Sequence, residues 1–119
     1  MQAKLNFKNL YHRSVAAVPF TYGVPVPEGA AKTIADIALF NAKGQPTPVA
    51  VRSMATWPDG SIRWALLDFC GDFEPNEKST WQLALGEGVK PLPPKNPVTV
   101  ENTAEGIRVS NGRLTATFR

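Results

Sequence analysis

The feature that most constrains the fold is a turn that leads directly into the most apolar segment of the chain. Residues 58–60 read Pro-Asp-Gly: proline presets φ, aspartate bonds its own backbone, and glycine tolerates positive φ. Residues 62–69 then carry apolar side chains on both faces of an extended segment, which is typical of a strand buried on two sides. Residues 49–57 have the composition of its antiparallel partner. We predict that this β-hairpin is the centre of the fold.

Short alternating segments predict further strands on both sides of the hairpin. Residues 4–8 and 80–85 alternate apolar and polar side chains, which is the period of a half-buried strand. For residues 34–40 we prefer a strand to a helical turn, because a turn-forming segment follows at 41–45. Short strands in a chain with 11 Pro and 9 Gly indicate an all-β protein. The residues that we expect in the structural core include Trp64, Leu66, Trp81 and Leu83.

The distribution of glycine and proline predicts how the chain is divided. A connector at 89–97, rich in proline, separates a first strand-rich part, 1–88, from residues 98–119. Three more strands are expected after the connector, and the Asn-Gly pair at 111–112 is a strong hairpin signal between the last two. The alternation is still running at Arg119. We therefore expect residues 98–119 to be the start of a following β-sandwich domain or a hairpin that closes the first part.

Charge and hydropathy exclude several classes of partner. The 119-residue chain has a formal net charge of +3, but its lysines and arginines are scattered, so no basic stripe for nucleic acid is expected. No apolar run approaches the length that spans a bilayer, so we expect no membrane segment. The amino-terminal residues have no apolar stretch of the kind found in signal peptides. The cellular location stays open.

The residues that most often carry catalysis or bind metals are scarce. His12 is the only histidine and Cys70 the only cysteine, which excludes an intramolecular disulfide and leaves little for a metal centre or a catalytic triad. Because Cys70 ends the apolar segment, we expect it to be a small buried hydrophobe. We predict no catalytic residue, no metal ligand and no cofactor in this chain.

Four side chains beside turns are candidates for binding a ligand. Asp59 and Arg63 flank the central turn, where such a pair can hydrogen-bond a sugar or a carboxylate. Trp57 and Tyr22 also lie beside turns, where exposed aromatic rings can stack on sugars. The alternative is structural: Asp59 caps its own turn while Arg63 packs its stem on Trp57. The pattern favours the structural interpretation and leaves the binding role open.

Two segments of the chain together carry a resemblance to a known family. Residues 20–29 read Phe-Thr-Tyr-Gly-Val-Pro-Val-Pro-Glu-Gly, and residues 57–69 read Trp-Pro-Asp-Gly-Ser-Ile-Arg-Trp-Ala-Leu-Leu-Asp-Phe. These segments resemble, in order and spacing, the G-V-P-x-P-x-G and W-P-D-G-S-x-R/K-W segments in the amino-terminal domain of the exo-rhamnogalacturonan lyase-like family. The resemblance spans residues 18–85 and implies a RIFT-type β-barrel, a small closed barrel.

The same resemblance implies where catalysis resides in such proteins. The family's chemistry is β-elimination on a uronic-acid-containing pectic polysaccharide, and it belongs to a later helical domain. No catalytic position can therefore be transferred to this chain. Members of the family are commonly exported.

These observations lead to a prediction for the fold and one for the function. We expect an all-β, small closed barrel with a carboxyl-terminal hairpin, and an immunoglobulin-like sandwich is the alternative. We expect a non-catalytic module of a larger carbohydrate-active protein, which contacts further domains of the same polypeptide or copies of itself. The alternatives are a structural interaction module, as in a phage tail, and a carbohydrate-binding module that contacts polysaccharide.

Overall fold

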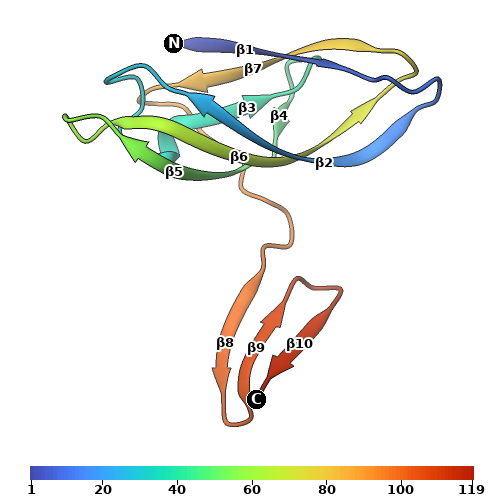
Figure 1. Ribbon diagram of the computed structural model, residues 1–119, viewed down its shortest axis with the longest axis vertical. Helices are drawn as coiled ribbons and strands as arrows, with labels where there is room; N and C mark the ends of the chain where they lie inside the picture. The colour runs from blue at the N-terminus through green and yellow to red at the C-terminus, as the bar shows by residue number, and fades with distance from the viewer.

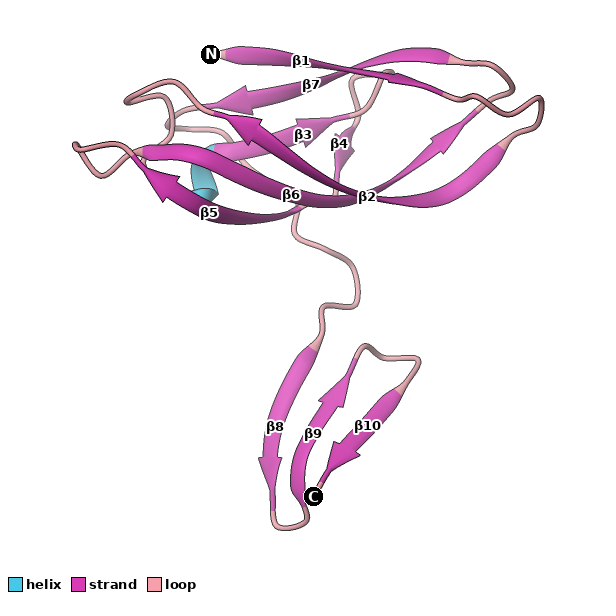
Figure 2. Ribbon diagram, viewed as in Figure 1, coloured by secondary structure: helices cyan, strands magenta, loops and turns pink.

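A computed structural model describes all residues, 1–119, and contains ten strands with almost no helix (Figure 1 and Figure 2). The all-β prediction is therefore confirmed. The only helical element is a short 3-10 turn, η1 (Ile34–Asp36). The strands, in chain order, are β1 (Gln2–Lys8), β2 (Val15–Pro25), β3 (Ile37–Phe40), β4 (Pro46–Thr47), β5 (Ala50–Thr56), β6 (Ile62–Phe73), β7 (Lys78–Leu85), β8 (Thr99–Thr103), β9 (Gly106–Ser110) and β10 (Thr115–Phe118).

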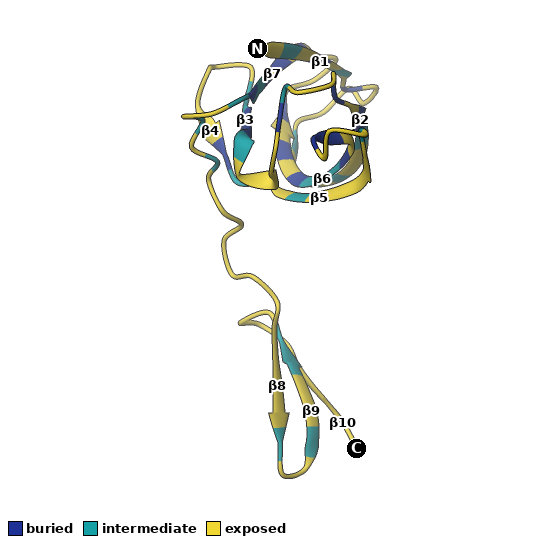
Figure 3. Ribbon diagram, turned by 90° about the vertical axis from the view of Figure 1, so that its left-hand side faces the viewer, coloured by how far each residue is buried: buried dark blue, intermediate teal, exposed yellow.

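The first seven strands form two antiparallel sheets that enclose one core. One sheet has the order β1-β7-β3-β4 and the other β2-β6-β5. Strands β5 and β6 form the predicted hairpin around the Pro-Asp-Gly turn. Only β6 is central, between β2 and β5, and β5 is an edge strand of the sheet. Viewed from the side, the strands curve around a common interior (Figure 3). The hydrogen-bond ladders leave two open sheets, because no ladder joins one to the other.

The core lies between the two sheets and contains an aromatic cluster. Rings from both sheets meet there: Phe7 of β1 lies 5.1 Å from Phe20 of β2 between ring centroids, and 5.6 Å from Trp81 of β7. Trp81 is 3% exposed and Leu83 is fully buried. The buried cluster has 15 members: Leu5, Val24, Val26, Ala31, Ile37, Leu39, Val49, Ile62, Ala65, Leu67, Phe69, Phe73, Trp81, Leu83 and Leu85.

The prediction that the central strand, β6, is buried on both faces is wrong. Trp64 is 43% exposed and Leu66 is only half-buried, so neither is the fully buried core residue that the sequence predicted. Cys70, on the same outward side of β6, is exposed as well. The reason is that the β2-β6-β5 sheet has the core on one face only, and no second layer covers the other face. The side chains that alternate with Trp64 and Leu66 are the ones that point into the core.

The segment 34–40 is a strand only from Ile37 onward. The Asp36 carboxylate accepts hydrogen bonds from the backbone N–H groups of Lys32 and Thr33, which bends residues 34–36 into the turn η1. Strand β3 then pairs with β7. The prediction of a strand over the whole segment missed this local hydrogen bonding.

The connector after β7 runs along the first seven strands and then leaves them, and its Pro94 and Lys95 line a hollow with residues of β2 and β6. The N–H of Val49 donates to the carbonyl of Leu92 at 3.1 Å, which ties the connector to the corner between β4 and β5. Beyond it, β8, β9 and β10 form a separate three-stranded antiparallel sheet (Figure 1). The radius of gyration is 16.8 Å, whereas a compact domain of this length has about 13.5 Å. The extra length comes from this second sheet. The only helical element, η1, has three residues, so the structure contains no membrane-spanning helix.

Candidate functional site

The two segments that carry the family resemblance lie side by side at one end of the first seven strands. The N–H of Val26 donates to the carbonyl of Arg63 at 2.9 Å, and the N–H of Ile62 donates to the carbonyl of Ala31 at 2.8 Å. The indole Nε1–H of Trp57 donates to the carbonyl of Val26 at 2.8 Å. Residues far apart in sequence are therefore joined by backbone and side-chain hydrogen bonds. Three of the four predicted binding residues, Trp57, Asp59 and Arg63, lie at this end of the molecule.

The turn itself is held by a small network around Ser61, which is 3% exposed. The Ser61 hydroxyl donates to the Asp59 carboxylate at 2.6 Å and accepts from the N–H of Gly29 at 2.9 Å. The Ser61 N–H donates to the same carboxylate oxygen at 2.9 Å. Gly60 has a φ of 86°, which only glycine adopts without strain. Asp59 therefore caps its own turn, as the structural interpretation expected.

These hydrogen bonds lower the pKa of the Asp59 carboxyl. The Ser61 hydroxyl, and then the Ser61 N–H, hold the pKa of the Asp59 carboxyl below its ordinary value of 3.8, because both donate to the charged form. A carboxyl group whose pKa is lower in the folded than in the unfolded protein stabilises the fold at pH values above its unfolded-state pKa. This stabilisation is lost as the pH falls through the folded-state pKa. The relevant window is therefore below pH 3.8.

Replacing Asp59 by asparagine should reduce the pH dependence of stability in that acidic window. Asparagine keeps an oxygen that can accept from Ser61 but has no proton to gain, so the free energy of unfolding of Asp59→Asn should fall less steeply below pH 3.8 than that of the wild type. Urea unfolding between pH 2 and pH 6, a range of about four units around this window, measures both slopes. Identical slopes would show that Asp59 keeps its ordinary pKa in the folded protein.

Arg63 and Trp57 form the second contact at this end. The Arg63 guanidinium carbon lies 4.8 Å from the centroid of the Trp57 ring, which is a cation–π contact. Trp57 is half-buried, and its one donor is already used by Val26. Arg63 makes no ion pair with any carboxylate. The guanidinium is thus the one side-chain group among Trp57, Asp59, Ser61 and Arg63 with donors left for a ligand.

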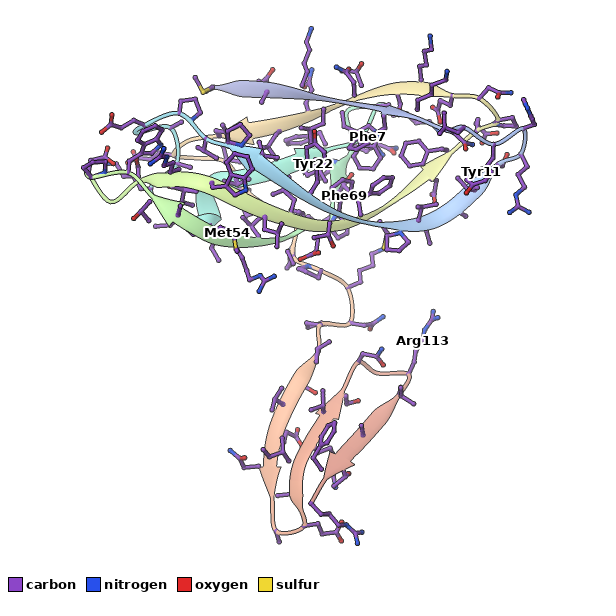
Figure 4. All side chains as sticks on the ribbon, viewed as in Figure 1. Phe7, Tyr11, Tyr22, Met54, Phe69 and Arg113 are labelled. Atoms are coloured by element: carbon purple, nitrogen blue, oxygen red, sulfur yellow. The ribbon has the colours of Figure 1, made fainter.

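Tyr22 does not join this group. It lies on β2 opposite Leu67 and is 46% exposed. Its ring meets Phe7 edge-on at 6.2 Å between centroids, and Figure 4 shows these two residues with Phe69 along the middle of the molecule. The structure brings three of the four predicted binding residues into one turn and places Tyr22 on β2, in contact with Phe7 of β1. A ligand role for any of the four stays a prediction.

Two further features gave no signal in the sequence. The Trp64 indole lies against Gly23, where an added Cβ would stand 2.8 Å from its Nε1, and Trp64 is 43% exposed. At the β6–β7 end, a cavity of about 320 Å³ is lined by polar groups that include Asp72 and Glu74. Both carboxylates accept hydrogen bonds, from the N–H of Ala17 at 2.7 Å and from the hydroxyl of Ser14 at 3.0 Å. No three His, Cys, Asp or Glu side chains are grouped for metal binding.

Comparison with known proteins identifies the family of this fold. The model of the PcRGLX-like N-terminal RIFT barrel domain matches residues 3–85, which run from β1 through the last residue of β7. A search of curated proteins and a search of solved structures each gave no significant match. The match agrees with the two motif segments and favours a RIFT barrel over the immunoglobulin-like sandwich. The resemblance seen in the sequence is therefore confirmed: the chain belongs to the family of PcRGLX-like N-terminal RIFT barrel domains.

Proposed function

We propose that this chain is a non-catalytic amino-terminal module of a larger rhamnogalacturonan lyase-like protein, and that it holds neighbouring domains in position. The family description, an N-terminal domain, supports this role. The hydrogen bonds of the two motif segments support it as well, because Trp57, Asp59 and Ser61 use their polar groups to hold the fold. In this proposal the two sheets act as one closed barrel, with the β1–β2 seam sealed by the contacts of Phe7 with Phe20 and Tyr22.

The observation that carries the proposal is the uncovered apolar face of the β8–β10 sheet. The register places Val100, Val109 and Ala116 in one cross-strand row, and Ile107 opposite Phe118 in the next. Val100 is 66% exposed and Phe118 is 62% exposed. The opposite face is polar, with Glu101 and Arg108 3.9 Å apart. Figure 3 shows this sheet mostly exposed, with a few half-buried residues on β8 and β9. A one-sided apolar sheet is a surface for contact with another folded unit.

The connector limits where the apolar face of the β8–β10 sheet can make this contact. Leu92 is tied to Val49, Pro94 and Lys95 line a hollow with residues of β2 and β6, and the second sheet begins at Thr99. A short proline-containing tether of this kind keeps the apolar face within a limited distance of the barrel. The occupant that we propose is a further domain of the same polypeptide. A second copy of the chain is the alternative, and it corresponds to a structural module of an oligomer.

When the 119-residue chain is studied by itself, its apolar β8–β10 face should cause self-association. A single lysine introduced on that face should reduce this self-association. Ala116 and Thr117 are neighbours on opposite faces of β10, so they form a matched pair. In light scattering at high protein concentration, Ala116→Lys should lower the apparent mass toward the monomer, because a lysine on the apolar face must be desolvated in any contact. Thr117→Lys adds the same charge to the polar face and should change the mass little.

The outcomes of this experiment separate the possibilities. A wild-type monomer at all concentrations, with residues 98–119 resistant to proteolysis, would mean that the sheet folds onto the barrel in solution. A stoichiometric dimer that only Ala116→Lys dissociates would favour the oligomer module over the docking of a further domain. Release of unsaturated sugars from rhamnogalacturonan by the chain itself would contradict the non-catalytic role.

A further inference from the structure

A second apolar surface lies at the opposite end of the barrel from the motif turn, where β1 passes into β2. Figure 4 places Tyr11 at this end. A cavity of about 360 Å³ opens there, and its nine lining residues include seven apolar ones. We call it the end pocket. Pockets of this size with mostly apolar walls are typical of sites for small ligands.

The floor of the end pocket is made of three aromatic rings. Phe7 and Phe20 lie 5.1 Å apart between ring centroids, Phe20 and Phe73 lie 5.7 Å apart, and Phe7 and Phe73 lie 6.1 Å apart. The contacts of Phe73 with Phe7 and with Phe20 are edge-on, with interplanar angles of 62° and 70°. Such a floor offers an incoming aromatic ring the tilted and edge-to-face geometries that aromatic pairs prefer.

One wall of the end pocket is built by a β-bulge in β2. The register shifts between Val15 and Val18, and Ala17 between them has a φ of 52°. The N–H of Ala17 donates to the Asp72 carboxylate at 2.7 Å, which anchors the bulge. In a regular strand Val15 and Val18 would point to opposite faces, but the extra residue turns both toward the pocket, where both are half-buried.

The lip of the end pocket is held in place by a buried asparagine. The Asn9 side chain is 5% exposed, donates to the carbonyls of Arg13 and Glu74 at 2.9 and 2.8 Å, and accepts from the N–H of Tyr11 at 2.9 Å. This network fixes the loop that carries Leu10 and Tyr11, which are 75% and 60% exposed. Two large apolar side chains are thus held in solvent beside a preformed cavity, which lowers the ordering cost of binding.

The only charge in the lining of the end pocket is positive. Lys8 is the only charged residue that lines the end pocket, and it lies opposite Lys78 in the β1–β7 register. The Arg13 guanidinium carbon lies 5.7 Å from the centroid of the Tyr11 ring on the lip. The nearby carboxylates of Asp72, Glu74 and Glu77 accept hydrogen bonds from the Ala17 N–H, the Ser14 hydroxyl and the Glu74 N–H, and none of the three lines the end pocket. An anionic group on a ligand would therefore meet Lys8 as the only charge in the lining.

From this arrangement we propose that the end pocket binds an aromatic carboxylate: a ring system seated on the phenylalanine floor, with its carboxylate beside Lys8. The proposal is independent of the module role, because it concerns the far end of the barrel. A preformed pocket of this size supports a dissociation constant on the order of 1 mM for a ligand of about 14 non-hydrogen atoms.

The test uses naphthalene-2-acetate and its uncharged counterpart 2-(2-naphthyl)ethanol with the full chain. Both should bind saturably by titration calorimetry, and amide shifts in NMR spectra should map to residues 7–20 and 73. Val18→Trp fills the cavity and should weaken binding of both at least tenfold. Met54→Trp, on an exposed part of β5 away from the pocket (Figure 4), is the matched control and should leave binding unchanged. Lys8→Gln should weaken the acid about 2–5-fold and leave the alcohol unaffected.

The proposal is overturned by any of several results. No saturable binding up to about ten times the expected constant by a folded protein would exclude the site. Shifts confined to residues 98–119 would place the probe on the exposed sheet instead. Equal weakening of acid and alcohol by Lys8→Gln would remove the role of charge. The NMR map requires only the wild type, so it decides the location even if Val18→Trp fails to fold.

Discussion

Replacing Trp81 by alanine is expected to lower the free energy of unfolding by about 3–5 kcal/mol, the range for large-to-small changes at buried aromatic residues. Trp81 is 3% exposed and lies between Phe7, Phe69 and Phe73, with ring centroids 5.4 to 6.0 Å from its own. Alanine would leave a cavity among rings that come from both sheets, so packing between the sheets is lost as well. Urea unfolding followed by far-UV circular dichroism measures the change.

Trp64 is the natural control for this experiment, because the sequence makes the two tryptophans look equivalent. Trp64 is 43% exposed, so Trp64→Ala should cost about 1–2 kcal/mol, in proportion to the smaller apolar area that it buries. If the two substitutions cost the same, or if Trp64→Ala costs more, the sheet must be covered on the face that is open in this structure.

Adding one methyl group at Gly71 should also be destabilising, by about 1–3 kcal/mol, as expected for overpacking of a core. A Cβ at this position would stand 2.9 Å from Phe73 and 3.0 Å from Trp81, and both side chains are almost fully buried. Neither ring can move without disturbing the aromatic cluster. Thermal and urea unfolding of Gly71→Ala test this expectation.

Gly23 provides the matched comparison. Its Cβ would stand 2.8 Å from the Trp64 Nε1, which is as close as any contact at Gly71. Because the Trp64 indole is exposed, it can swing into solvent, and Gly23→Ala should cost under about 1 kcal/mol. Tryptophan fluorescence should then shift to longer wavelength.

In a double-mutant cycle, Trp81→Phe should relieve part of the cost of Gly71→Ala. Additive effects would mean that the methyl group meets a different neighbour.

Local sequence determined most of the secondary structure. The Pro-Asp-Gly turn, the alternation over 4–8 and 80–85, and the Asn-Gly hairpin at 111–112 each predicted strands or turns that the structure contains. These signals are local, because φ preferences and a period of two act within a few residues. The two motif segments also sufficed to identify the family, which the match to residues 3–85 confirmed.

Only the tertiary structure decided which side of each strand is covered. The sequence of β6 is apolar on both faces, and nothing in it indicates that Ala65 is buried while Trp64 is exposed. That difference depends on how many layers pack against the sheet, which is a property of distant strands. The role of Asp59 likewise depends on Ser61 and on Gly29, 32 residues from Ser61 in the chain.

The end pocket also depends on contacts between residues far apart in the chain. It requires the β2 bulge, the loop held by Asn9, and Phe73 from β6, so three separate segments must meet before it exists. The sequence therefore determined the strands, the turns and the family of this protein through short-range backbone preferences. The exposed outer face of β6, the hydrogen bonds around the Asp59 carboxylate and the end pocket were decided by packing between residues far apart in the chain. Burial depends on such neighbours, and no local pattern encodes them.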